Sequence, residues 1–316
     1  MKKEVFCAGV LMVLGLFLVQ NLGRKAENFI PYQTDISVPV AQDLQKRVPA
    51  EYRRSGALLV ATHPTTPPTV FLTPDTMQLQ GREIDIMAAV AQLLGLKLYW
   101  ANPGSLGSTV LGLASHRYDV ALANLNVTET RLKKIDFVSY FDDKRLGLLG
   151  LATTQGQVTQ WHDLCGFTIG AGSGTENATV LQNHSRDCKQ AGAAPITVML
   201  FPSRPAGVQA IISGRVPYFL GPYEGVKAMA QGSHGQVVLT ATLDRHGSYV
   251  GMGLPRQSSL TPVITDAVNR LIELGIYQKI LGKWGISYGE IGKSYSNMDI
   301  LNSVGAQNDG RALHEP

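Results

Sequence analysis

The chain lacks the concentrated positive charge that marks a nucleic-acid-binding protein. Its formal net charge is only +4 over 316 residues, 16% of the residues are charged, and no run contains five or more lysines and arginines. Recognition of phosphates needs such charge gathered on one stretch or face. The sequence therefore predicts no nucleic-acid partner, and the mild basicity indicates little else.

Motifs of common enzymes are also missing. The sequence contains neither HExxH nor GxSxG, and the segment Gly292-Lys293-Ser294 does not complete a phosphate-binding loop because position 287 is serine. We therefore expect no catalytic residue, no resident metal and no cofactor. The chain has no internal repeat or low-complexity stretch, and it has one apolar run near membrane-spanning length rather than several.

Hydrophobic residues are plentiful. They make up 44% of the chain, which is enough for a sizeable core and excludes a disordered chain or a coiled coil. A length of 316 residues predicts two domains or one bilobed unit.

The N-terminus resembles an export signal. Lys2 and Lys3 precede an apolar run from Val5 to Val19, and Arg24 and Lys25 follow it. This charged start and short apolar run are typical of a secretory segment. We interpret residues 1–25 as a signal peptide or a retained N-terminal anchor, with possible membrane attachment through residues 5–23, and predict an extracytoplasmic location.

Three cysteines leave one pair once Cys7 is assigned to the apolar run. Cys165 and Cys188 lie in the exported part, where paired cysteines usually form disulfides. Two buried free thiols are the alternative. Metal binding is less favoured, because the spacing is not CxxC and His162 and His184 fit no zinc pattern.

Short apolar runs alternate with helical patterns after Gly56, which predicts an α/β fold. Asp85 is expected to cap a helix that ends at Gly95, and Thr261 to cap a second helix that begins with Pro262. Residues 26–55 are interpreted as a tether and residues 291–316 as a polar tail. The expected strands are Leu58–Ala61, Asp119–Ala123, Leu146–Ala152, Phe167–Ala171, Ile196–Leu200, Tyr218–Gly221, Val237–Ala241 and Tyr249–Leu254.

Four ordered blocks resemble the family 3 solute-binding proteins, the extracytoplasmic receptors of polar amino-acid ABC importers. They are GREIDI at 81–86, YDVA at 118–121 continuing through NVTETR and KIDF to 137, DLCG at 163–166 continuing through Gly174-Thr175 to Cys188, and NRLIELGIYQKILGKWGI at 269–286. The third block is similar to a subgroup with a disulfide in its second lobe. The resemblance covers residues 56 to 290.

The resemblance implies a type II periplasmic-binding-protein-like fold, in which two α/β lobes joined by a two-strand hinge enclose a ligand cleft. Lobe 1 would comprise residues 56–148 and 251–290, lobe 2 would comprise residues 149–250, and the strands Leu146–Ala152 and Tyr249–Leu254 would form the hinge. The implied partners are a small ligand, an amino acid or related carboxylate, and the membrane subunits of an importer.

The resemblance also assigns ligand contacts. Arg131 falls where the family clamps the α-carboxylate of its ligand, a role that suits the planar guanidinium fork. Asn124, Asn126 and Thr128 precede it, although each could instead cap a helix. The turn from Gly172 to Thr175 opens a helix, so Ser173 and Thr175 are predicted to receive a ligand oxygen.

Two departures from the family pattern concern the rest of the pocket. The aspartate that usually binds the ligand's ammonium aligns with Pro222. This departure predicts either that Glu176 or Glu224 replaces the aspartate or that the ligand lacks an amine. Thr66, Thr69 and Leu106 stand where aromatic residues are common; Tyr218 and Tyr223 could compensate, but they read more readily as core residues.

Two other functions share this fold. A membrane-tethered sensor without an importer would be favoured by a retained anchor. A periplasmic dehydratase would need the glutamate of a GGTNE turn, but here Glu176 comes one residue early and Asn177 occupies the matching position. Because an acid must first reach its substrate, the enzyme is the less favoured alternative.

Overall fold

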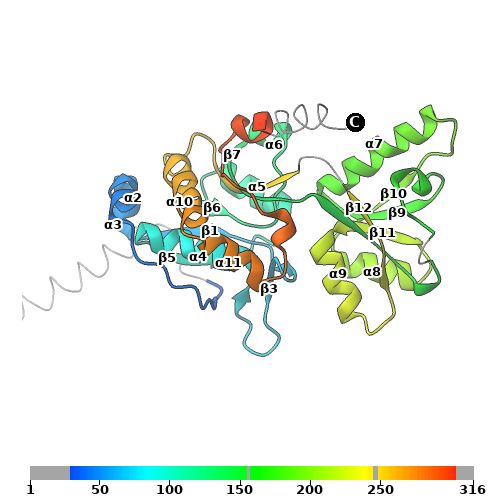
Figure 1. The fold of residues 1–316 in the computed structure, drawn as a ribbon, viewed down its shortest axis with the longest axis horizontal. Coiled ribbons are helices and arrows are strands. Elements are labelled where there is room, and N and C mark those ends of the chain that lie inside the picture. Colours follow the sequence, from blue (N-terminus) through cyan, green and yellow to red (C-terminus); the bar gives the residue numbers. More distant parts are fainter. Residues whose placement is uncertain (1–28, 155–156, 245–247, 304–316) are drawn as a thin grey trace, which may run out of the picture.

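The structure is a computed structural model that describes residues 29–154, 157–244 and 248–303. These residues form two α/β lobes side by side, each built on a five-stranded sheet (Figure 1). The expected α/β fold with two lobes is confirmed. The predicted export segment, residues 1–25, lies outside the described residues.

The sheet of lobe 1 has the order β5-β1-β6-β13-β7. Its strands are β1 (Ala57–Ala61), β5 (Lys97–Ala101), β6 (Val120–Ala121), β7 (Ile135–Asp142) and β13 (Tyr249–Pro255), and its larger helices are α4 (Arg82–Leu94), α5 (Leu106–Ala114), α10 (Thr261–Glu273) and α11 (Ile276–Lys283). All eight residues of β7 are buried, as expected of a strand covered on both faces. Helices α4, α10 and α11 pack on one another and close one core with the sheet.

The sheet of lobe 2 has the order β10-β9-β11-β8-β12 and separates two cores. Helix α7 packs on one face, and α8 and α9 pack on the other (Figure 1). Its elements are β8 (Arg145–Gly150), β9 (Thr168–Gly172), α7 (Glu176–Gln190), β10 (Thr197–Phe201), α8 (Arg204–Ile212), β11 (Tyr218–Pro222), α9 (Tyr223–Gly232) and β12 (Val238–Asp244).

The chain passes between the lobes at two neighbouring points. Strand β7 continues into β8 after Asp142, and β12 leads to β13 across residues 245–248. Asp142 pairs with Tyr249 in the first sheet and Arg145 pairs with Asp244 in the second, so the two crossings lie side by side. The chain therefore changes lobes between β7 and β8 and again between β12 and β13. The predicted boundaries at 148/149 and 250/251 differ by a few residues, because β8 lies wholly in lobe 2 and β13 wholly in lobe 1.

The interpretation of residues 26–55 as a tether is wrong for the part that the structure describes. Val38, Leu44 and Val48 are buried in the lobe 1 core, and the Val38 N–H donates to Gln92 Oε1 at 2.7 Å. This segment contains the short helices α2 (Gln42–Arg47) and α3 (Ala50–Ser55). Buried side chains scattered among prolines have no periodicity, which is why the pattern resembles a linker.

The predicted polar tail is likewise ordered as far as residue 303. Ile291, Ser294 and Ile300 are buried, and the Ser139 N–H donates to the Tyr295 carbonyl at 2.9 Å. Residues 291–303 are therefore part of lobe 1. Residues 304–316 lie outside the described residues.

Helix α4 begins four residues earlier than expected. Gly81 is its N-cap, and Gly95 ends it in the left-handed conformation at φ 67°. Asp85 therefore caps nothing; instead its carboxylate accepts bonds at 2.8 Å from Lys283 Nζ and from Trp284 Nε1. The helix expected at Thr261 is present, with Leu260 as its N-cap.

The remaining elements are short. A small sheet in lobe 1 has the order β2-β3-β4, and α6 contains a single turn. They are β2 (Thr65–Thr66), β3 (Val70–Leu72), β4 (Leu79–Gln80), α6 (Glu129–Leu132) and the 3₁₀ turns Ala152–Thr154, Trp161–Leu164 and Ser287–Gly289. Within the described ranges no helix combines the length and apolar character that crossing a membrane requires.

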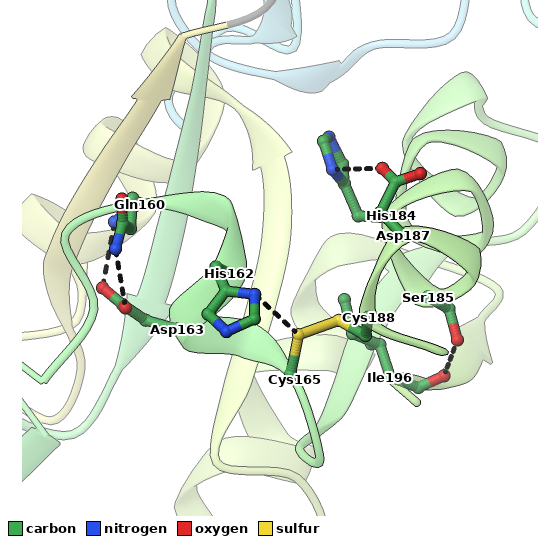
Figure 2. The surroundings of a disulfide bond; sticks show 9 residues. All are labelled: Gln160, His162, Asp163, Cys165, His184, Ser185, Asp187, Cys188 and Ile196. Carbon is green, nitrogen blue, oxygen red and sulfur yellow. Dashed lines mark hydrogen bonds and ion pairs between the residues drawn. A yellow bond between two sulfur atoms is a disulfide. The ribbon is translucent and has the colours of Figure 1, made fainter. Parts of the chain in front are cut away.

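A disulfide joins Cys165 to Cys188 in lobe 2, as predicted (Figure 2). It ties the end of the 3₁₀ turn Trp161–Leu164 to the last turn of α7, with the Cα atoms 5.7 Å apart. In the described part of the chain, no group of three or more His, Cys, Asp or Glu side chains could hold a metal ion.

Replacing both cysteines with serine is expected to lower the free energy of unfolding by about 3 kcal/mol, because the cross-link restricts the unfolded chain over a separation of 23 residues. Chemical denaturation measures this change. Reduced wild-type protein should match the Cys165→Ser/Cys188→Ser variant, and equal stability of the variant and the oxidised protein would contradict the expectation.

The surroundings of His184 predict that this residue contributes to the pH dependence of stability. Its ring stacks on Trp161 with centroids 4.0 Å apart, and Nδ1 lies 3.2 Å from Asp187 Oδ2 (Figure 2 shows the pair with Asp187). Burial lowers the pKa of His184 below 6.5, although Asp187 opposes this shift. The unfolded chain therefore takes up the proton first, so the contribution of the neutral ring to stability is present above about pH 6.5 and is lost as the pH falls.

Between pH 7.5 and 5.0 the Tm of the wild-type protein should fall further than that of His184→Gln. Thermal unfolding at both pH values tests this. Equal losses in the two proteins would show that His184 has no part in the dependence.

Candidate functional site

A cavity of about 380 Å³ lies between the two lobes. It opens where strands end: β9 leads into Gly172–Thr175, β10 into residues 202–204, and β11 ends at Pro222, all of which line the wall. Ligands of open α/β sheets commonly bind beyond the carboxyl ends of strands, where helix N-termini also meet. The fold thus positions this cavity as the candidate ligand site.

Arg131 reaches the cavity from lobe 1. The Thr128 hydroxyl caps the short helix α6 by accepting the Arg131 N–H at 3.2 Å, which fixes the backbone at this point. The guanidinium donates from Nη1 to the Asn126 carbonyl at 2.8 Å and from Nη2 across the cleft to the Gly174 carbonyl at 3.1 Å. Burial lowers its pKa, since the charged group has lost water, whereas nearby Glu176 opposes the shift. An anion in the cavity would supply the missing counter-charge.

Asn124 and Asn126 also line the wall and are held by buried partners. The Asn124 N–H donates to Glu83 Oε1 at 2.7 Å, and its Oδ1 accepts from Arg82 Nη2 at 3.1 Å. Asn126 donates from Nδ2 to the Ser248 hydroxyl at 2.9 Å. These bonds place both amides at the cavity without a conformational search on binding.

Ser173 and Thr175 line the opposite wall in lobe 2. The turn between them places Gly174 at φ 72°, and Thr175 is the N-cap of α7. The Thr175 hydroxyl donates to the Gly172 carbonyl at 2.7 Å instead of capping the helix. First-turn N–H groups of α7 therefore have no side-chain cap, which is the arrangement that suits an anionic oxygen.

Three predicted contact residues do not line the cavity. Thr128 serves as the cap of α6, and Glu176 accepts a bond from the Ser248 hydroxyl at 3.0 Å. Glu224 is buried beside the cavity but is turned toward lobe 1. Neither carboxylate has the position expected of a replacement for the family's ammonium-binding aspartate.

Glu224 instead joins the lobes. It lies at the start of α9 in lobe 2, and its Oε1 is 3.3 Å from Nη1 of Arg82 in lobe 1. Thr69 Oγ1 donates to the same oxygen at 3.5 Å, and the Tyr288 hydroxyl donates to Oε2. Burial raises the pKa of Tyr288, and the charge of Glu224 raises it further, so the phenol keeps its proton as the donor. The Arg82 guanidinium also lies over the Phe141 ring, 3.9 Å from its centroid.

Arg204 is the main residue that sequence reasoning missed. It is the first residue of α8 and lines the cavity from lobe 2, with its guanidinium donating to the Thr66 hydroxyl of lobe 1. Its neighbour Ser203 was recognisable as a helix cap just beyond a predicted strand, which is the only signal that could have placed it at the site. Other lining residues that were not predicted are His63, Thr65, Ser105, Gly107, Ala123, Asn177, Pro202, Ser203, Phe219, Leu220 and Gly221.

The departures noted in the sequence are visible in the wall. Pro222, Thr66 and Leu106 all line the cavity, whereas Thr69 is buried away from it. Among the lining residues that the structure describes, Phe219 supplies a phenyl ring, and neither Tyr218 nor Tyr223 lines the cavity. Within the described lining, no two aromatic rings enclose the space.

Residues 58–287 match the sequence profile of the bacterial extracellular solute-binding proteins, family 3. The arginine-binding protein ArgT of Corynebacterium glutamicum is 24% identical over 306 residues, covering 95% of this chain and 98% of that protein. The L-cystine-binding protein TcyJ of Escherichia coli K12 is 23% identical over 73% of this chain and 84% of that protein. Among solved structures, an ancestral arginine-binding protein bound to arginine superposes with a TM-score of 0.63 at 26% identity, covering 72% of this chain and 98% of that chain.

Proposed function

Because the chain belongs to the bacterial extracellular solute-binding proteins of family 3, we propose that it captures a small carboxylate-bearing solute between its lobes and delivers it to an ABC importer. The relatives named for arginine and cystine support an amino acid or a related acid as the solute. The observation that carries the proposal is Arg131, a half-buried cation in the interlobe cavity whose guanidinium already bonds to both lobes.

The proposed mechanism couples binding to lobe closure. A carboxylate on Arg131 that also reaches the N–H groups of the Ser173–Thr175 turn would connect lobe 1 to lobe 2. The paired crossings between β7 and β8 and between β12 and β13 are the points at which the lobes would rotate. Importer subunits would then recognise the closed arrangement of the two lobe surfaces.

The proposed location is extracytoplasmic. A disulfide in lobe 2 is in keeping with an oxidising compartment. Attachment through residues 5–23 is a separate proposal, because that segment lies outside the described residues. Determining the mature N-terminus by mass spectrometry would separate a cleaved signal from a retained anchor, and a retained anchor would favour the tethered-receptor alternative.

We propose a binding protein rather than an enzyme. Glu176, the acid nearest to the position that a dehydratase would use, does not line the cavity and accepts a bond from Ser248. A general acid needs hydrogen-bond reach to its substrate, and Asn177 at the wall cannot supply a proton. Turnover of prephenate or arogenate by the purified protein would contradict this part of the proposal.

A thermal-unfolding screen tests the function. The twenty amino acids, their derivatives and small carboxylic acids would be added singly to the purified protein. A solute at about 100 times its Kd should stabilise the folded state by about 2.7 kcal/mol, which shifts Tm measurably. The absence of a shift with any carboxylate-bearing solute would refute the proposed capture.

A further inference from the structure

We propose that the cavity takes a solute with two acidic groups and no ammonium group, a dicarboxylate, which Arg131 and Arg204 bind at its two ends. This inference rests on the proposed function of Arg131 and adds a second clamp from the other lobe. It concerns which acids bind, whereas the proposed function concerns whether a carboxylate-bearing solute binds at all.

The first observation that supports this proposal is that Arg204 has few partners for its guanidinium group. Its guanidinium has five N–H donors, and the hydrogen bond found for it among the described residues goes to the Thr66 hydroxyl. Burial lowers its pKa, while Glu224, Asp143 and Glu83 oppose the shift from a distance. Within the described part of the chain, neither Arg204 nor Arg131 has a carboxylate oxygen within the 4.0 Å of an ion pair. Two half-buried cations thus line one cavity, and no carboxylate of a described residue is in ion-pair contact with either.

The second support is the composition of the wall. Among the residues that the structure describes, the lining includes Arg131, Arg204 and His63 but neither aspartate nor glutamate. Glu224 is engaged by Arg82 and Tyr288, and Pro222 occupies the place of the family's aspartate. An ammonium group placed here would lose its water and gain no anionic partner, which is costly in a buried site. A second carboxylate would instead meet an existing cation.

The third support is the direction of the helices. The N-cap residues of α5, α7, α8 and α9 all line the cavity; they are Ser105, Thr175, Ser203 and Pro222. Each helix has at least nine residues and directs the positive end of its dipole at the same space. These fields favour anionic groups at both ends of a solute and disfavour a cationic one.

The inference separates this chain from the arginine-binding relatives. Free arginine carries an ammonium and a guanidinium besides its carboxylate, so two cationic groups would need partners. The described lining offers none with a negative charge. We therefore expect the solute of this chain to differ in class from the one that those names state.

The experiment compares acids that differ by one group. Calorimetric titration of the whole protein would use the α,ω-dicarboxylates from succinate to pimelate, the α-amino counterparts glutamate and 2-aminoadipate, monocarboxylates of equal chain length, and L-arginine. At least one dicarboxylate should bind at least about tenfold more tightly than its α-amino and monocarboxylate counterparts. The optimum chain length would then report the separation between the two guanidinium groups.

Three substitutions test the second clamp. Arg204→Gln should weaken dicarboxylate binding at least about tenfold and leave monocarboxylate binding within about twofold. Arg204→Lys keeps the charge and should retain part of the preference. Thr66→Val removes the hydrogen bond between Arg204 and Thr66 but leaves Arg204 in place. The preference for dicarboxylates should persist in this variant if Arg204 acts on the solute, and should be lost if Arg204 only bridges the lobes.

The possible failures are distinguishable. Tighter binding of L-arginine or another α-amino acid than of every dicarboxylate, with dependence on Arg131, would overturn this inference and leave the proposed function intact. An equal loss of monocarboxylate and dicarboxylate binding in Arg204→Gln would also overturn it. The absence of binding by any acid would remove the proposed function and this inference with it.

Discussion

Arg131→Gln is expected to weaken binding of the solute by about 100-fold or more. The substitution removes the cation that would pair with a carboxylate, and loss of one partner of a buried, hydrogen-bonded charge pair costs about 2–5 kcal/mol. Glutamine retains a polar side chain, so the fold should persist. Calorimetric titration with the tightest solute from the screen measures the loss.

Two variants make this result specific. Arg54→Gln removes an exposed arginine of α3, for which no ion pair with a described residue is found, and should leave the affinity unchanged. Arg131→Lys preserves the charge but loses the planar fork, so its affinity should fall between those of the wild-type and glutamine proteins. Unchanged affinity in Arg131→Gln would refute the carboxylate clamp.

Glu224→Ala is expected to destabilise the closed arrangement of the lobes by about 3–5 kcal/mol. Arg82 is fully buried, and removing its partner leaves an uncompensated charge in the interior. Because the pair joins the two lobes, opening of the cleft would return Arg82 to water. The variant should therefore show a lower Tm together with a larger radius of gyration in small-angle X-ray scattering.

The double variant Arg82→Met/Glu224→Leu is the matched control. It replaces both charges with apolar side chains of similar size, and such replacements of buried pairs are often neutral or stabilising. Its Tm should lie closer to that of the wild-type protein than to that of Glu224→Ala. A Glu224→Ala protein with wild-type stability and scattering would show that the pair does not hold the lobes together.

The architecture was predictable because its strands are buried. The runs at 218–221 and 249–254 are apolar without alternation, as in sheets covered on both faces, and both are strands in the structure. The cysteine pair was predictable from the compartment, and the family blocks supplied Arg131. Each of these signals is local in the sequence.

The other site features depend on contacts between residues that are far apart in the sequence. Glu224 looks like a free acid, yet its partner Arg82 is 142 positions away in the other lobe. Arg204 reads as an ordinary arginine at the start of a helix, and only the packing of the two lobes against each other brings it to the cavity that Arg131 lines. Asp85 has the sequence context of a cap, but Lys283 and Trp284 recruit its carboxylate.

A crystal structure of the protein with its tightest-binding solute tests the central claim most directly. We predict that the solute lies between the lobes with one carboxylate on the Arg131 guanidinium and with the Ser173–Thr175 turn within hydrogen-bond distance. A solute bound outside this cavity, or inside it with no contact to Arg131, would contradict the account.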